Sequence, residues 1–433
     1  MRPNVQPNPI TEDTEEALTE GDDYVRGVGT TRSALAHREF RLMWLGSFAS
    51  NIGTWMQTVV LGSYAFKLTE SSVFVGALAF AQLGPLLLLS VVGGMVADAL
   101  DRRKLLIILQ TEQLVFSLAL AAIVAASDNP SRVLIFGCVL AIGIGNALNA
   151  PVWGAVVPSL VGQADLGAAI ALNSTMINGS RVIGPALAGI LYPVFGPAWM
   201  FTANAVTYVF VIAALVVVRF PDVPRAAEQG WHRVLGGVRV ARANPVVGRI
   251  LLALAIFSLL SLPFVTLFPA LAEKDLGLSS DSLGYGLLYA VFALGACAGA
   301  LSIGTVLANA VKMRLVRIGL LGFAVMMAVW AMVRAPAPAY PVVFLLGAVY
   351  FGTTTAMLTV LQTVLTEEVR GRVMALWFMA FGGMVAIAGL VFGPVLDLTD
   401  GSVVLVVGAV AAALLAWWCD LTRLARQAGI EPV

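Results

Sequence analysis

Charged residues are scarce in this sequence. Only 12% of its 433 residues are Asp, Glu, Lys or Arg, whereas 59% are hydrophobic. Soluble globular domains carry roughly 25% charged residues, so this composition excludes that class and indicates a chain that lies largely within a membrane. The formal net charge of +1 leaves no basic surface that would suggest nucleic acid and no acidic surface that would suggest a cationic substrate.

The sequence holds only three cysteines and two histidines. Cys138, Cys297 and Cys419 fall within apolar stretches at unrelated spacings, a pattern typical of membrane-buried hydrophobes and not of a disulfide or a metal site. His37 and His232 fall outside those stretches. Because the apolar stretches contain no histidine, no paired carboxylates and no cysteine near a base, we expect neither an intramembrane enzyme nor a cofactor.

Long apolar runs are what the sequence has in abundance. Each run is near or above the ~20 residues with which a helix crosses a bilayer. The sequence therefore predicts an all-α polytopic membrane protein with twelve transmembrane helices. The predicted spans are residues 40–66, 73–97, 105–126, 133–153, 167–195, 199–218, 246–272, 283–308, 315–333, 341–365, 373–396 and 403–421.

Polar stretches divide the chain into five parts. An arginine-rich linker at 219–245 joins a first half of six spans, 38–218, to a second half of six, 246–422. Residues 1–36 carry seven carboxylates and no apolar core, so we expect a disordered acidic tail. Residues 423–433 form a second tail.

The two halves share glycine positions. Gly76 and Gly284 lie 208 residues apart, and Gly184 and Gly393, each followed by a proline, lie 209 residues apart. Nearly equal offsets indicate an internal duplication, which is typical of transporters built from two repeats.

Basic residues are distributed unequally between the two sides of the membrane that twelve spans define. The side with both termini and the 219–245 linker holds 21 of the 26 Lys and Arg residues. The opposite side holds four, and Arg181 lies within a span. Since cytoplasmic loops are enriched in basic residues, we expect a multi-pass protein of the cell membrane with both termini in the cytoplasm.

The loop between the second and third spans is short and charged. Gly94 lacks a side chain, so a neighbouring helix can approach closely there. Asp98 follows at a helix C-terminus, where the dipole disfavours a carboxylate, and we expect it to pair with a cation or with the amides of another helix N-terminus. Arg102 and Arg103 are nearby cations, and Arg372, at the start of the eleventh span, is the partner that we expect.

The order of Gly94, Asp98 and the pair Arg102-Arg103 resembles the loop signature between helices 2 and 3 of the major facilitator superfamily of transporters. Ala99 stands where that signature usually has a basic residue, which favours a partner for Asp98 outside the loop. The resemblance implies that this contact latches one end of an alternating-access cycle.

The fifth span carries a second resemblance. Gly184-Pro185 begins a run to Gly189 that is similar to the glycine-proline signature of helix 5 in major facilitator exporters, although tight packing around a proline kink would explain it as well. Residues 53–57, 171–174 and 181–187 resemble bacterial exporters related to the enterobactin exporter and the multidrug efflux pumps grouped with it. The resemblance covers about residues 38–424 and implies proton-driven export, usually of drugs, siderophores or other secondary metabolites.

Glu112 is the only carboxylate deep within a predicted span, and Arg181 is the only basic residue there. Apolar surroundings favour a protonated carboxylate, and a nearby guanidinium favours the charged form. We therefore hypothesise that Glu112 carries the coupled proton and that Arg181 tunes it, with Asp98 as the second candidate. The alternative is a static brace, in which Glu112 snorkels and Asn178 and backbone carbonyls satisfy Arg181.

The spans predicted to line a central cavity offer aromatic, amide and thioether side chains without a fixed charge. Such a lining suits a mid-sized apolar or amphipathic solute better than a sugar or an anion. The alternative is that half of these residues face neighbouring helices. The candidates are Asn51, Trp55, Asn146, Asn149, Phe264, Phe268, Tyr350, Thr354 and Met357.

The sequence thus predicts a secondary active transporter, a monomer in the lipid bilayer that moves a small molecule in exchange for protons and has no nucleic-acid partner. The alternative is a non-transporting membrane receptor or scaffold whose acidic tail and arginine-rich linker bind a cytoplasmic partner. Flux of a solute would separate the two.

Overall fold

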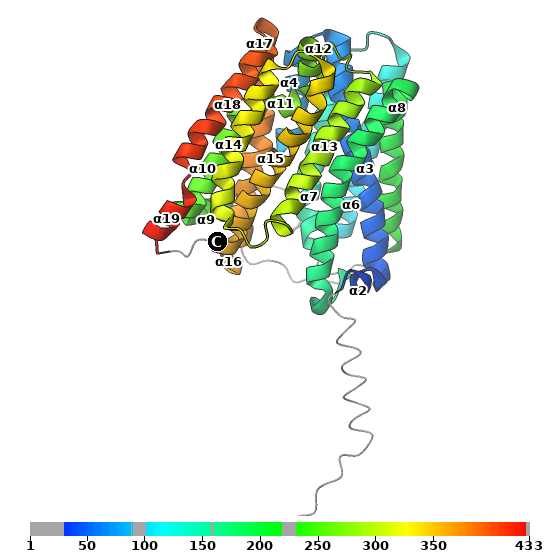
Figure 1. Ribbon diagram of the computed structural model, residues 1–433. Coiled ribbons are helices and arrows are strands. Elements are labelled where there is room, and N and C mark those ends of the chain that lie inside the picture. The colour runs from blue at the N-terminus through cyan, green and yellow to red at the C-terminus, as the bar shows by residue number, and fades with distance from the viewer. Residues whose placement is uncertain (1–29, 88, 90–100, 157–159, 219–230, 430–433) are drawn as a thin grey trace, which may run out of the picture.

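The structure is a computed structural model that describes residues 30–87, 89, 101–156, 160–218 and 231–429. Every regular element in these ranges is a helix, as Figure 1 shows, which confirms the all-α fold. Within them, eight helices are long and apolar enough to cross a membrane, or nine if a bent pair is one span. This arrangement is consistent with twelve spans, because the longest helix covers two of them.

The first group of helices corresponds to the first six predicted spans. The start of α6 is fixed by Asp101, whose side chain accepts hydrogen bonds from the amides of Arg103 and Lys104 at 2.9 and 3.1 Å. The members of this group are α3 (Arg38–Thr69), α4 (Ser72–Leu83), α6 (Arg102–Ala126), α7 (Arg132–Val156) and α8 (Leu166–Val217).

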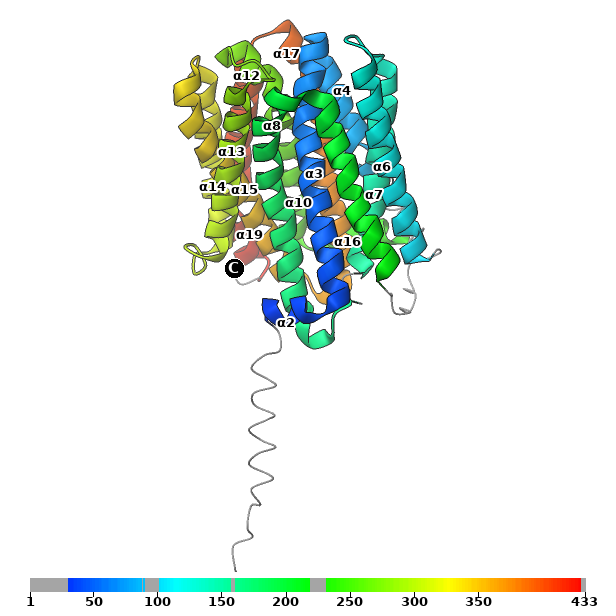
Figure 2. The same ribbon diagram turned by 90° about the vertical axis from the view of Figure 1, so that its right-hand side faces the viewer.

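Helix α8 consists of two arms that meet at Gly196, whose φ of 76° lies in the left-handed region. The first arm follows α3 in the same direction, since Gly179 lies against Phe48 and Gly184 against Trp55. The second arm returns along the bundle (Figure 2). The two arms are therefore the fifth and sixth predicted spans.

The second group of helices corresponds to the last six predicted spans. The seventh span is interrupted at Pro263 and Pro269, which lack the amide hydrogen that a continuous helix needs. The members of this group are α10 (Pro245–Leu260), α11 (Pro263–Thr266), α12 (Phe268–Leu276), α13 (Leu283–Gly304), α14 (Lys312–Met332), α15 (Pro336–Val364), α16 (Glu367–Phe378), the π-helical turn η3 (Met379–Gly383), α17 (Met384–Leu398), α18 (Gly401–Trp418) and α19 (Leu421–Gln427).

Besides the 3₁₀ turn η2 (Gln163–Asp165) and most of α19, two segments outside the predicted spans are helical. The expectation of a disordered tail over 1–36 is wrong for its last residues, because Thr30 caps the helix α2 (Thr31–Ala36) and Ala34 is buried. Part of the 219–245 linker forms α9 (Trp231–Ala243), which is bent by 112° from α10 and packs against α16. Short-range capping and docking, which hydropathy does not reveal, order both segments.

The ends of the described chain, α2 and α19, lie at the same end of the bundle (Figure 1). We call this the terminal end and the opposite one the distal end. At the distal end the two groups meet through backbone. A β-carbon on Gly76 would overlap the Gly389 carbonyl, and one on Gly286 would overlap Gly189. Small residues allow this approach of α4 to α17 and of α8 to α13, so the distal end is closed.

Polar contacts reinforce the distal closure. Lys67 of the first group forms an ion pair with Asp281 of the second. Asp397 accepts a hydrogen bond from the Ser72 amide at 2.9 Å and pairs with Lys274 at 3.0 Å. Partial burial acts to raise the pKa of Asp281, but hydrogen bonds from Lys67 and Ser279 and the charge of Lys67 together outweigh that effect and hold the pKa below its usual range.

The glycine contact predicts a steric test. Gly286→Val should separate α13 from α8 and shift the protein away from the distally closed state, because the new side chain would occupy the position of Gly189. Spin labels at Asn129 and Arg334, in a variant without the native cysteines, would report a longer distal distance. Gly137→Val is the control, since a β-carbon there meets no atom within 4 Å. An unchanged distance in Gly286→Val would contradict the assignment.

The ion pair predicts a pH dependence of the same distance. A lowered pKa means that the Asp281 carboxylate contributes fully above its ordinary value of about 4 and loses this contribution as the pH falls further. Asp281→Asn should lower the ratio of closed to open protein by up to about fivefold, since exposed ion pairs contribute up to about 1 kcal/mol. Asp281→Asn should also remove part of the change in distal distance that occurs as the pH falls. Asp128→Asn, at an exposed distal carboxylate, should leave both unchanged.

Candidate functional site

Arg181 lies where the two groups of helices meet at the centre of the bundle. Its guanidinium carbon is 5.4 Å from the centroid of the Trp55 ring on α3 and 5.6 Å from that of the Phe351 ring on α15. Both distances are within the range of cation–π attraction. The side chain therefore contacts both groups at once.

The Arg181 guanidinium is incompletely satisfied. Its Nε is buried and donates no hydrogen bond to a described residue. Asn178, which the static-brace alternative gives it as a partner, donates instead to the Ser174 carbonyl at 2.9 Å. In the described part of the chain, aromatic faces stabilise this cation in place of a carboxylate.

Glu112 lies within the first group, on the face of α6 that packs against α7. Its Oε2 fits where Gly145 has no side chain, and this oxygen is buried without a hydrogen bond to a described residue. No ion pair joins Glu112 to Arg181 within the described ranges. Asn146, one of the predicted cavity residues, follows Gly145 on α7. The two charges predicted to act together are thus held by different neighbours in this conformation.

The predicted cavity residues of the second group belong to a closely packed aromatic cluster. Phe264 and Phe268 are fully buried, and their rings lie 5.7 and 5.4 Å from the ring of Trp330. Met357 is also fully buried, and Tyr350 is 3% exposed. These side chains face neighbouring helices in this conformation, as the alternative reading of the sequence expects. A role for them in binding solute stays a prediction.

Thr354, the remaining candidate of the second group, is also buried. Its hydroxyl donates to the carbonyls of Tyr350 and Phe351 within α15, both at 3.2 Å. This local bonding satisfies the hydroxyl without a solute.

The predicted cavity residues of the first group are less enclosed. Trp55 is half-buried, as are Asn51 and Asn149. Asn51 donates to the Ser47 carbonyl at 2.8 Å, and the Asn149 side chain accepts from Gln110 at 3.2 Å. The amides keep part of their hydrogen-bonding capacity, which a polar group of a solute could use.

The sequence reasoning missed a buried amide network in the first group. Gln57 Oε1 accepts hydrogen bonds from Asn204 at 2.8 Å and from Ser117 at 3.1 Å. The Tyr208 hydroxyl accepts from Asn204 at 3.3 Å and contacts Thr54 at 3.3 Å. The network ties α3, α6 and α8 together. Amide side chains within apolar spans were the available signal, because an unpaired amide in a membrane is costly.

The predicted hinge is only partly described. Gly94 and Asp98 lie outside the described residues. Arg103 donates from Nε to the Leu215 carbonyl at 2.7 Å and so anchors the start of α6 to the second arm of α8. Arg372 packs against the glycines of α9, which places the linker helix at the start of the eleventh span. Pairing of Asp98 with Arg372 stays a prediction.

Solved structures share this fold. A mutant of the nucleoside transporter NupG superimposes with a TM-score of 0.71 and 14% identity, over 88% of this chain and 98% of that one. A bacterial homologue of the iron transporter ferroportin, in an inward-facing state, gives a TM-score of 0.68 and 16% identity over 90% and 98%. At such identities the likeness concerns the fold alone.

Sequence relatives give a narrower placement. The enterobactin exporter EntS of Shigella boydii is 27% identical over 342 residues, which cover 79% of this chain and 81% of EntS. EntS of Salmonella typhimurium is 28% identical over 343 residues, with the same coverage. The profile of the family described as "Transmembrane secretion effector" matches residues 29–428. The chain therefore belongs to the transmembrane secretion effector family of major facilitator transporters.

Proposed function

We propose that this transporter exports an amphipathic small molecule by alternating access, in exchange for protons. The observation that carries the proposal is the Arg181 guanidinium, which contacts Trp55 of the first group and Phe351 of the second. A cation shared between two groups changes its surroundings when the groups move apart. Such a change is what a transporter needs to couple an ion gradient to its conformation.

Glu112 is the proton carrier in this proposal. Its buried Oε2 has no hydrogen-bond partner among described residues, a setting that favours the neutral carboxylic acid. A conformation that brings water or the Arg181 guanidinium closer favours the charged form and releases the proton. Because Glu112 and Arg181 make no ion pair in the distally closed state, the two conditions can alternate between conformations.

The solute class follows from the half-buried residues of the first group and from the relatives. Trp55 offers a ring face, and Asn51 and Asn149 offer amides, which together suit a molecule with aromatic and polar parts. The relatives at 27–28% identity are enterobactin exporters. We therefore place the solute among drugs, siderophores or other secondary metabolites.

Flux in vesicles tests export. Purified protein is reconstituted into lipid vesicles whose interior is made acidic. The measurement uses the protein molecules whose terminal end faces the outside of the vesicle. Ethidium, a fluorescent amphipathic cation, and enterobactin are the probes. Accumulation should follow the proton gradient and disappear when a protonophore is added. Gradient-driven movement in the reverse direction would contradict export. Absence of flux for both probes in folded protein would favour the receptor or scaffold alternative.

Glu112→Gln separates proton coupling from a structural role. The variant should lose gradient-driven accumulation and the pH dependence of flux but retain exchange of labelled for unlabelled probe, because glutamine preserves the shape of the side chain without carrying a proton. Glu39→Gln, at an exposed carboxylate of α3, is the matched control and should behave as wild type. A wild-type pH profile with a lower unfolding temperature would identify Glu112 as a static brace and direct attention to Asp98.

A further inference from the structure

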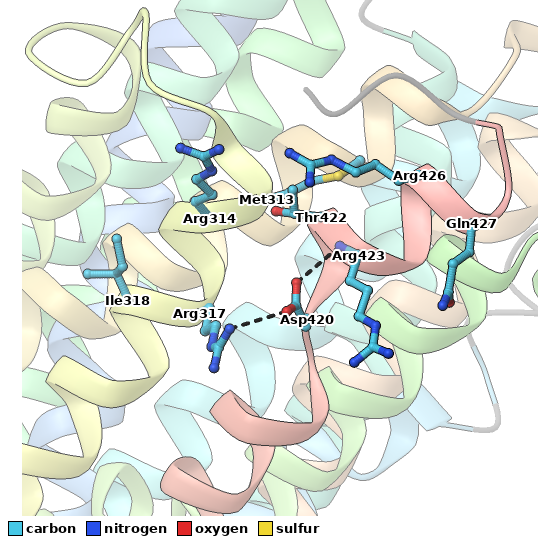
Figure 3. A pocket seen from close by; sticks show the side chains of 9 residues that line it. All are labelled: Met313, Arg314, Arg317, Ile318, Asp420, Thr422, Arg423, Arg426 and Gln427. Atoms are coloured by element: carbon cyan, nitrogen blue, oxygen red, sulfur yellow. Dashed lines mark hydrogen bonds and ion pairs between the residues drawn. The ribbon is translucent and has the colours of Figure 1, made fainter.

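A pocket of about 490 Å³ opens between α14 and α19 at the terminal end. Arginines dominate its lining. Figure 3 shows Arg314 and Arg317 extending from α14, and Arg423 and Arg426 from α19. Each pair is spaced three residues apart, so the two members of a pair share a face of their helix. Packing of α14 against α19 brings the two basic faces to one pocket.

The pocket has far more positive than negative charge. Asp420 is the one carboxylate in its described lining. One oxygen accepts from Arg317 at 3.2 Å, and the other accepts from the Arg423 amide at 3.1 Å and caps α19. Among described residues, the guanidiniums of Arg314, Arg423 and Arg426 form no ion pair. Three cations are therefore left to attract an anion.

An apolar strip leads away from the pocket along α14. Ile318 belongs to the lining and is 62% exposed. Leu321 and Val325, on the same face of α14, are 46% and 55% exposed. In a transmembrane helix such side chains face lipid acyl chains. The pocket thus lies where a basic surface meets the hydrocarbon region.

We propose that this pocket binds the phosphate headgroup of an anionic phospholipid, whose acyl chains lie along the strip on α14. Guanidinium groups suit phosphate because they donate paired hydrogen bonds to its oxygens. The bias of basic residues predicts that the terminal end lies in the cytoplasm, and the cytoplasmic leaflet is the one that is rich in anionic lipid.

The apolar strip distinguishes a lipid from other anions. A soluble phosphate compound would use the arginines but gain nothing from Ile318, Leu321 and Val325. The acidic segment of the same chain, at residues 12–23, would likewise leave the strip without a partner. A phospholipid matches both the charge and the apolar surface, which is why we choose it.

Native mass spectrometry of the full chain from nanodiscs tests the proposal. The nanodiscs contain phosphatidylglycerol and phosphatidylcholine, and the measured quantity is the enrichment of retained phosphatidylglycerol. The double variant R423Q/R426Q should lower this enrichment by about tenfold or more, because it removes two of the three guanidiniums that are free to bond the phosphate oxygens. Both side chains are exposed and unpaired in the described structure, so the fold should be preserved.

The control is R239Q/R242Q, which removes two exposed arginines from α9 at the same end. It should retain the enrichment of the wild type. An equal loss of phosphatidylglycerol enrichment in the two double variants would mean that general surface attraction explains the effect, and it would overturn the proposal. No loss of enrichment in R423Q/R426Q would overturn it as well. Glycerol phosphate, which lacks acyl chains, is added as a competitor. Displacement of phosphatidylglycerol by this compound would show a soluble phosphate site instead.

Discussion

A guanidinium in apolar surroundings constrains the centre of this transporter. Arg181 has aromatic rings on two sides, and each such contact contributes about 1–2 kcal/mol where water is excluded. One of these rings, Phe351, belongs to α15 and is within reach only while the two groups of helices are close. The crossing of Gly189 and Gly286 permits that closeness, because a side chain at either position would separate α8 from α13. Distal closure and the central cation therefore belong to one conformation.

The two groups of helices are stabilised by different interactions. In the first group, hydrogen bonds centred on Gln57 and Asn204 join three helices, and their direction fixes how those helices are rotated. The second group relies on ring contacts such as Phe264 with Trp330, which tolerate small displacements. Interruptions of regular helix at Pro263 and at η3 also fall in the second group. Directional hydrogen bonds thus hold the helices around Glu112, whereas ring packing holds those of the second group.

Much of the fold could be predicted from hydropathy, because apolar runs of sufficient length have few alternatives to a helix in a membrane. The turn near Gly196 and the breaks near the prolines of the seventh span fall where turn-forming residues interrupt the apolar pattern. Hydropathy missed α2 and α9, since both are short and polar and depend on a cap or on docking to a neighbour. The order of α9 comes from tertiary contact with α16, which no local pattern contains, whereas the Thr30 cap of α2 is a local signal that hydropathy does not register.

The candidate site was less predictable for the same reason. Rarity of charge within the spans was enough to single out Glu112 and Arg181. Their surroundings, Gly145 for the first and Phe351 for the second, come from other helices, so spacing along one helix does not reveal them.

The arginines of the terminal pocket also depend on tertiary contact, although here the residues themselves are easy to find in the sequence. Their three-residue spacing on α14 and on α19 is visible in the sequence, where it looks like part of a general enrichment of basic residues on one side of the membrane. That enrichment sets the side of the membrane on which arginines lie but not their mutual distance. The packing of α19 against α14 is what brings the four arginines together around Asp420. A single carboxylate cannot neutralise four guanidiniums. Tertiary packing thereby turns a general enrichment of arginine into a pocket with a net positive charge and a defined shape, and such a pocket can select a ligand.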